Sequence, residues 1–214
     1  MLKKVAHKIE HFIRSCKNAG SLVKDIHAKE CRTLILMYHS TPEAPNDYFY
    51  STPRDRFAAQ MHFVTKHFHA VSIDEVVRSI EDSSFRSQRV GQHKCAVTFD
   101  DGFRDNYSEA FSILEELNIP ATVFVTTNFI DSDNTTFMEW EELRYMAESE
   151  LITLGAHTKS HINLQALTRE DVKREVVECK DIIEKRTGAR IDYFSYTGGA
   201  FDGRALDTVE EYYR

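Results

Sequence analysis

The chain has 214 residues, of which 42% are hydrophobic and 29% are charged, as in a globular protein of one domain or slightly more. This composition excludes a disordered chain, a collagen-like chain and a coiled-coil rod. No apolar run approaches the roughly 20 residues that a membrane-spanning helix needs. The net charge of −7 argues against nucleic acid as a partner.

The first 32 residues differ from the rest in charge. Residues 1–32 carry eight Lys or Arg and three Asp or Glu, a net charge of +5, which leaves −12 on residues 33–214. Five apolar residues repeat there at helical spacing: Val5, Ile9, Phe12, Ile13 and Cys16. This predicts a basic amphipathic helix that either packs on its own domain or contacts an anionic membrane surface.

Charged residues interrupt the apolar stretch that an export signal requires, so we expect a cytoplasmic protein. Its four cysteines form no C-x-x-C pair and are expected to be reduced thiols. Cys95 and Cys179 lie in apolar segments and are interpreted as small core residues. We therefore divide the chain into a helical segment, 1–32, and one domain, 33–214.

Beyond residue 32, short apolar runs alternate with amphipathic stretches. The runs predict strands at 33–38, 70–71, 95–99, 121–125, 151–154 and 193–196. Helices are predicted around 53–64, 73–80, 113–117, 140–146, 172–183 and 205–214, with polar loops at 81–92 and 128–137. This alternation indicates an α/β fold, a barrel-like parallel sheet with helices outside. A closed (β/α) barrel takes about 250 residues, so we expect an incomplete one.

Two stretches that carry reactive side chains follow predicted strands. Asp100 and Asp101 come directly after one strand, and His157 and His161 come shortly after another. The carboxyl ends of parallel strands face the ligand site, so these four residues are candidates for one site. An Asp-Gly turn would also explain the first stretch, and a chance pair of surface histidines the second.

Two histidines and one aspartate make the three-ligand set of a catalytic metal, which leaves one position open. The i, i+4 spacing lets the two histidines face one way on a helical turn. Imidazole ligands make zinc the default metal, although cobalt, nickel or iron also fit. The second carboxylate would then suit a general base.

These motifs resemble those of a known family, the polysaccharide deacetylases (carbohydrate esterase family four). Thr98–Gly102 is similar to the family's T-F-D-D-G motif, and His157–His161 to its H-[ST]-x-x-H motif. Four further segments resemble the bacterial branch that modifies exopolysaccharide or cell-envelope glycans: Leu36–His39, Phe57–Met61, Pro120–Val125 and Phe194–Gly199. The resemblance extends from about Leu34 to the end of the chain.

The resemblance implies a deformed seven-stranded barrel and a metal-dependent hydrolase that removes N-acetyl groups from the amino sugars of a glycan. It implies that Asp101, His157 and His161 hold the metal and that Asp100 deprotonates the metal-bound water. The backbone N–H of Gly198 would stabilise the oxyanion. The expected partner is therefore an N-acetylated carbohydrate, and the products are acetate and a free amine.

The chain departs from the family pattern in two places. Thr197 stands where the family has proline, so the loop around Gly198 is expected to be looser. The chain ends at Arg214, before the family motif whose histidine protonates the leaving amine, and before the last barrel strands. Two interpretations stay open, an N-deacetylase acting on a glycan or its precursor, or a catalytically impaired glycan- or metal-binding remnant.

Two other residues at the ends of predicted strands are substrate-binding candidates. His39 follows the first strand and either contacts substrate or is a hydrogen-bonded packing histidine. Tyr196 either stacks on a sugar ring or packs in the core.

Overall fold

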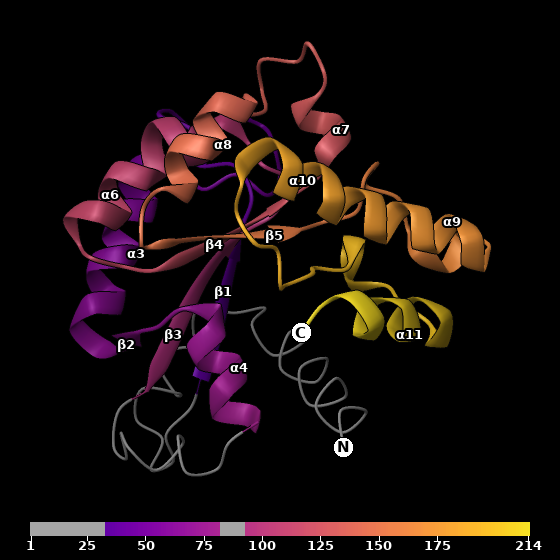
Figure 1. The fold of residues 1–214 in the computed structure, drawn as a ribbon. Coiled ribbons are helices and arrows are strands. Elements are labelled where there is room, and N and C mark those ends of the chain that lie inside the picture. Colours follow the sequence, from indigo (N-terminus) through magenta and orange to yellow (C-terminus); the bar gives the residue numbers. More distant parts are fainter. Residues whose placement is uncertain (1–32, 82–92) are drawn as a thin grey trace.

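A computed structural model describes residues 33–81 and 93–214 and has an α/β architecture, a parallel sheet with helices along its outside (Figure 1). The predicted helical segment 1–32 and nearly all of the predicted loop 81–92 lie outside the described residues. None of the described helices has the length and apolar character needed to cross a membrane.

The sheet has five strands within the described ranges: β1 (Thr33–Tyr38), β2 (His69–Ala70), β3 (Lys94–Phe99), β4 (Ala121–Val125) and β5 (Ile152–Ala156). They lie in the order β1-β3-β4-β5, with β2 pairing the start of β3, and every pairing is parallel. The register sets Tyr38 beside Phe99 and Val125 beside Ala156. The carboxyl ends of these four strands therefore meet at one edge. The predicted parallel sheet is confirmed, and barrel closure stays a prediction.

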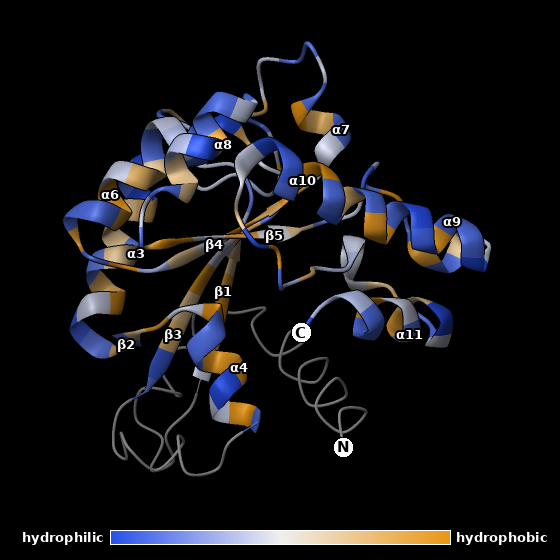
Figure 2. Cartoon of the chain, in the orientation of Figure 1, coloured by the Kyte–Doolittle hydropathy of each residue, from blue (hydrophilic) through white to orange (hydrophobic). Residues whose placement is uncertain are grey.

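Both faces of the sheet are buried. On β3, Val97 and Phe99 belong to the main core, whereas Ala96 between them belongs to a smaller cluster with Phe124 and Val76. Alternate side chains of a strand point to opposite faces, so a strand buried on both sides is a continuous apolar run. Figure 2 shows this pattern, with β1 and β3 largely hydrophobic and the helices polar on their outer surfaces.

The α-helices run in chain order around the sheet: α3 (Arg54–His67), α4 (Ile73–Glu81), α6 (Phe111–Glu116), α7 (Thr127–Ile130), α8 (Trp140–Ala147), α9 (Arg169–Lys173), α10 (Cys179–Thr187) and α11 (Gly203–Tyr212). The π-helical segments η1 (Asn106–Ala110) and η3 (Arg174–Glu178) precede α6 and α10, and η2 (Leu164–Ala166) and η4 (Thr197–Gly199) are 3-10 turns. The helix predicted around 172–183 is confirmed as the continuous run α9-η3-α10. It ends at Gly188 in a left-handed conformation. Cys95 and Cys179 are buried free thiols, as expected.

The strand predicted at 193–196 is wrong, because the segment forms only an isolated bridge between Phe194 and Ala156. The Ser195 N–H donates to the Ala156 carbonyl, but the Ser195 carbonyl accepts a bond from the His157 ring instead of from a neighbouring backbone. Pairing therefore stops after one bridge, because the next acceptor is used to orient a side chain.

The loop predicted at 128–137 is wrong at its start, where α7 (Thr127–Ile130) forms one turn of helix. A four-residue helix is too short to produce a recognisable hydrophobic period. A tertiary contact supports it, since the Asn128 N–H donates to the Lys159 carbonyl at 2.9 Å.

Candidate active site

The predicted site residues lie at the carboxyl edge of the sheet. Asp100 and Asp101 follow β3, and the Asp100 N–H donates to the Tyr38 carbonyl at the end of β1. His157 follows β5, and its N–H donates to the Val125 carbonyl at the end of β4. Backbone pairing thus continues for one residue beyond the strands and brings Asp101 and His157 to the same place, as the sequence predicts.

Asp101, His157 and His161 form a cluster in which one potential ligand atom from each lies within 4.8 Å of the others. Oδ1 of Asp101 lies 3.0 Å from His161 Nε2 and 3.6 Å from His157 Nε2. Ligands about 2.0–2.2 Å from a tetrahedral ion are roughly 3.3–3.6 Å apart. The spacing therefore fits a single divalent cation.

The orientation of His157 supports this fit. Its Nδ1–H donates to the Ser195 carbonyl at 2.9 Å, which leaves Nε2 with a lone pair that faces Asp101. Burial lowers the pKa of His157 to about 4, so the ring is neutral near pH 7. Oδ1 of Asp101 is buried and has no well-aligned hydrogen-bond donor. Two acceptor atoms thus face each other without a proton, an arrangement that a cation would satisfy.

Asp101 itself remains ionised near neutral pH. Burial alone would raise its pKa, but the adjacent His161 and then His157 outweigh burial and hold the pKa below its usual value. The same contact raises the pKa of His161, which is only partly buried. The cluster therefore combines a carboxylate with two imidazoles, a donor set typical of zinc and similar metals.

The loop that carries the two histidines differs from the predicted helical turn. Thr158 and His161 adopt left-handed backbone conformations, with φ of 65° and 57°, and Asp101 does so at 76°. Such conformations are uncommon outside glycine and are concentrated at functional sites. Here they turn the chain so that both imidazoles reach one carboxylate.

Contacts from distant segments hold this loop in place. The Thr126 hydroxyl donates to the His157 carbonyl at 2.9 Å. Between the two histidines, both the N–H and the hydroxyl of Ser160 donate to the Glu175 carboxylate, at 2.8 and 2.6 Å. The Thr158 hydroxyl lies 3.2 Å from that of Thr197, which links the loop to the segment around Gly198. Glu175 is not predictable from the sequence, because no local pattern connects it to a loop 15 residues earlier.

Asp100 is buried beside the cluster. Burial, and then the neighbouring charge of Asp101, raise the pKa of Asp100 to about 7, despite opposing effects of His161 and the Ser195 side chain. A carboxyl group with a pKa near the working pH can both accept and release a proton. Asp100 directly precedes Asp101 in the chain, and its role as general base stays a prediction.

The other predicted site residues lie around this centre. The ring of His39 stacks on Tyr50 at 4.9 Å, and burial lowers its pKa more than Asp101 raises it. Gly198 lies in η4 with a left-handed backbone, φ of 64°. The ring of Tyr196 packs against Phe194 and Phe201, as the core alternative expects, while its buried hydroxyl has no hydrogen-bond partner among residues 33–81 and 93–214. Sugar contact by Tyr196 stays a prediction.

The family model described as polysaccharide deacetylase matches residues 87–213, more than half of the chain, including both predicted metal motifs. The chain belongs to the polysaccharide deacetylase family. The resemblance inferred from the motifs is thus confirmed.

Three relatives illustrate the match. A predicted polysaccharide deacetylase of Bacillus subtilis (strain 168), YxkH, is 25% identical over 184 residues, 86% of this chain and 62% of that protein. The poly-beta-1,6-N-acetyl-D-glucosamine N-deacetylase of Escherichia coli (strain K12) is 31% identical over 84 residues, 33% of this chain and 12% of that protein. The chain thus spans less than two thirds of both. The Streptococcus pyogenes deacetylase PplD in complex with acetate superposes with a TM-score of 0.74 at 20% identity, over 86% and 81% of the two chains, and shares the fold.

Proposed function

We propose that this family member is a divalent-metal-dependent hydrolase that removes N-acetyl groups from amino sugars of a polysaccharide or glycan precursor. The observation that carries the proposal is the buried Asp101 oxygen that faces two imidazole nitrogens and has no well-aligned hydrogen-bond donor among the described residues. The Asp100 carboxyl beside it supplies the base that amide hydrolysis needs. The similarity to a named N-acetylglucosamine N-deacetylase supports the substrate class.

In this proposal Asp101, His157 and His161 hold the cation, with zinc as the default from the donor set. When bound, the cation would polarise the acetyl carbonyl and make water a better acid. The Asp100 carboxylate accepts a proton from the attacking water, and the Gly198 N–H donates to the amide oxygen as negative charge develops there. The C–N bond then breaks, and the amine leaves with a proton, which yields acetate and a free amino sugar.

His39 and Tyr196 are proposed substrate contacts. His39 lies at the carboxyl edge of the sheet, close enough to Asp101 for that charge to affect its pKa. The buried and unpartnered hydroxyl of Tyr196 offers a donor that a sugar group would satisfy.

Two proposals rest on the sequence alone, a cytoplasmic location and contact of residues 1–32 with an anionic membrane surface. Deleting residues 1–30 should release the protein from vesicles that contain an anionic lipid. Unchanged partitioning of the deletion variant would contradict the membrane contact.

The function is tested by acetate release from N-acetylglucosamine oligomers by the zinc-loaded protein. Asp100→Asn and His157→Ala serve as the matched variants. We expect release by the native chain and its loss in both variants, with zinc retained by Asp100→Asn and lost by His157→Ala. Zinc binding at one equivalent without acetate release would support the remnant alternative, which the complete ligand set does not favour. Absence of zinc binding would contradict both interpretations.

A further inference from the structure

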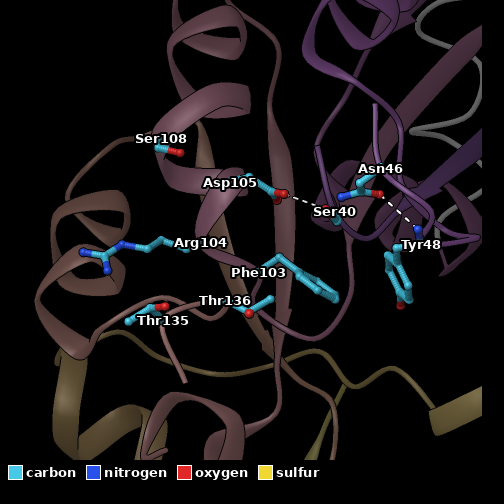
Figure 3. Close-up of a pocket in the computed structure, with 9 residues that line it drawn as sticks. All are labelled: Ser40, Asn46, Tyr48, Phe103, Arg104, Asp105, Ser108, Thr135 and Thr136. Carbon is cyan, nitrogen blue, oxygen red and sulfur yellow. Dashed lines mark hydrogen bonds between the residues drawn. The ribbon is translucent and has the colours of Figure 1, made fainter. Parts of the chain in front are cut away.

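A cleft of about 490 Å³ lies between the segment that follows β1 and the segment that follows β3, with Thr135 and Thr136 also in its lining (Figure 3). The rings of Tyr48 and Phe103 lie together at one side of it, 5.4 Å apart. Two residues that line the cleft are close in sequence to residues of the proposed site. Phe103 is two residues after Asp101, and the lining residue Ser40 directly follows His39.

Ring contacts form a continuous wall from the metal-ligand cluster to this cleft. Phe129 lies 5.4 Å from His161, and Phe137 lies 4.4 Å from Phe129. Phe137 in turn lies 5.1 Å from Phe103, which contacts Tyr48. A ligand that occupies the cleft would therefore run along an aromatic surface toward the cluster.

The segment that carries Tyr48 presents three consecutive aromatic side chains to solvent. Tyr48, Phe49 and Tyr50 are 40%, 88% and 53% exposed. A bridge between Ser40 and Ser51 closes the base of this segment, and the Asn46 side chain accepts the Tyr48 N–H at 3.1 Å. The aromatic run was visible in the sequence, but its position beside the site was not. Exposed aromatic rings on a fixed loop are typical of a binding surface.

The rest of the lining is polar. Asp105, held by the Ser40 hydroxyl, and the side chains of Ser108 and Thr136 line the cleft beside the two rings. A pyranose ring has an apolar C–H face that stacks on an aromatic ring, and hydroxyl groups at its edge that need polar partners. A lipid surface would leave the hydroxyl groups of Ser108 and Thr136 without suitable partners.

We propose that this cleft is a glycan subsite, in which Tyr48 stacks on the sugar unit next to the one that loses its acetyl group. The inference rests on the proposed N-deacetylase function, since it assigns the neighbouring sugar to that substrate. It predicts that the protein binds oligomers more tightly than single sugars, because one unit alone cannot fill both the cleft and the centre.

The test measures the affinity of the full-length, metal-free chain for an N-acetylglucosamine tetramer and for the monomer by calorimetry. Tyr48→Ala should weaken tetramer binding about 10-fold and monomer binding less, as expected for a lost stacking contact. Tyr48→Phe should retain native affinity to within about twofold. Thr136→Val, which keeps the side-chain shape, should weaken tetramer binding about threefold. Tyr145, on α8 and 57% exposed, provides the control, and Tyr145→Ala should bind like the native chain.

Each outcome bears on the subsite. The subsite would be overturned if the native and Tyr48→Ala chains bound the tetramer with equal affinity. It would also be overturned if the native chain did not bind the tetramer. Tyr48→Ala could also weaken partitioning into vesicles and leave tetramer affinity unchanged. That result would assign the aromatic surface to membrane contact and overturn the glycan subsite. Tetramer binding that depends on Tyr48, in a protein that releases no acetate, would support the subsite and contradict the proposed function.

Discussion

The interior of the sheet and its carboxyl edge bury very different groups only a few residues apart. Val97 and Phe99 on β3 are 1% exposed and pack among apolar side chains. Immediately beyond the strand, Asp100 and Asp101 are almost as buried, at 5% and 4%, and Oδ1 of Asp101 has no well-aligned hydrogen-bond donor among the described residues. Burial stabilises the first pair, whereas it raises the pKa of Asp100 and is outweighed at Asp101 only by the adjacent imidazoles. The edge is therefore organised for chemistry.

The largest effect is expected from Asp101→Asn, which removes the charge that the cluster shares. Zinc affinity should fall by more than the roughly 10- to 100-fold typical of an outer-shell change, because the altered residue is a proposed direct ligand. The metal-free protein should lose some stability near pH 7, because the two imidazoles hold the Asp101 pKa below its usual value and the ionised carboxylate therefore favours the folded state. Asparagine tolerates the left-handed backbone at this position. Zinc calorimetry and urea unfolding of the metal-free chain provide the two measurements.

Asp171→Asn on α9, which alters a partly exposed ion pair with Arg174, is the control and should alter neither measurement strongly. A loss of stability in Asp101→Asn with unchanged zinc affinity would contradict the comparison. It would show that Asp101 supports the fold in the way that an interior residue does.

The interior counterpart is Leu114→Ala on α6. Leu114 is fully buried in the main core, a few residues before the chain enters β4 at the opposite edge of the sheet. Truncation should lower the free energy of unfolding by about 2–5 kcal/mol. The folded fraction should bind zinc as the native chain does. Reduced zinc affinity at temperatures where the variant is fully folded would show that the two regions are not independent.

The contrast between the interior of the sheet and its carboxyl edge also explains which features could be predicted from the sequence. The strands β1, β3 and β4 were located closely, because a segment buried on both faces is apolar throughout. Asp101, His157 and His161 could be grouped as candidate metal ligands because residues that end parallel strands meet at one edge, whatever the details of the loops. These are properties of local pattern and topology.

The sequence-based predictions were wrong where contacts between distant segments determine the backbone conformation. The turn at Thr158 depends on Thr126, Glu175 and Thr197, none of them local to it. The strand predicted at 193–196 was lost because a Ser195 backbone acceptor binds the His157 side chain. No periodicity reports such contacts, so a site's residues are easier to predict than the loop that presents them.

Glu175→Gln tests whether the distant clamp matters for the site. Its carboxylate accepts both Ser160 donors between the two histidines, so the neutral amide should hold the loop less firmly. We expect zinc affinity to fall about 10-fold, with little change in stability. The neighbouring Glu178→Gln breaks only an exposed ion pair with Lys159 and should change zinc affinity less than about twofold. Equal effects of the two variants would show that general surface charge, and not the clamp, is responsible.

The smallest effect is expected from Thr168→Ala at the start of the helical run that carries Glu175. The Thr168 hydroxyl caps α9 by accepting the Asp171 N–H at 3.2 Å, so its loss should lower the free energy of unfolding by about 1 kcal/mol. Thr168→Ser should restore the cap. Zinc affinity should stay native, because the cap and the Glu175 clamp act through different bonds of the same run. If Thr168→Ala lowered both the thermal stability and the zinc affinity, the start of α9 and the carboxyl edge of the sheet would be one cooperative unit. The contrast with the carboxyl edge would then hold only for the interior of the sheet.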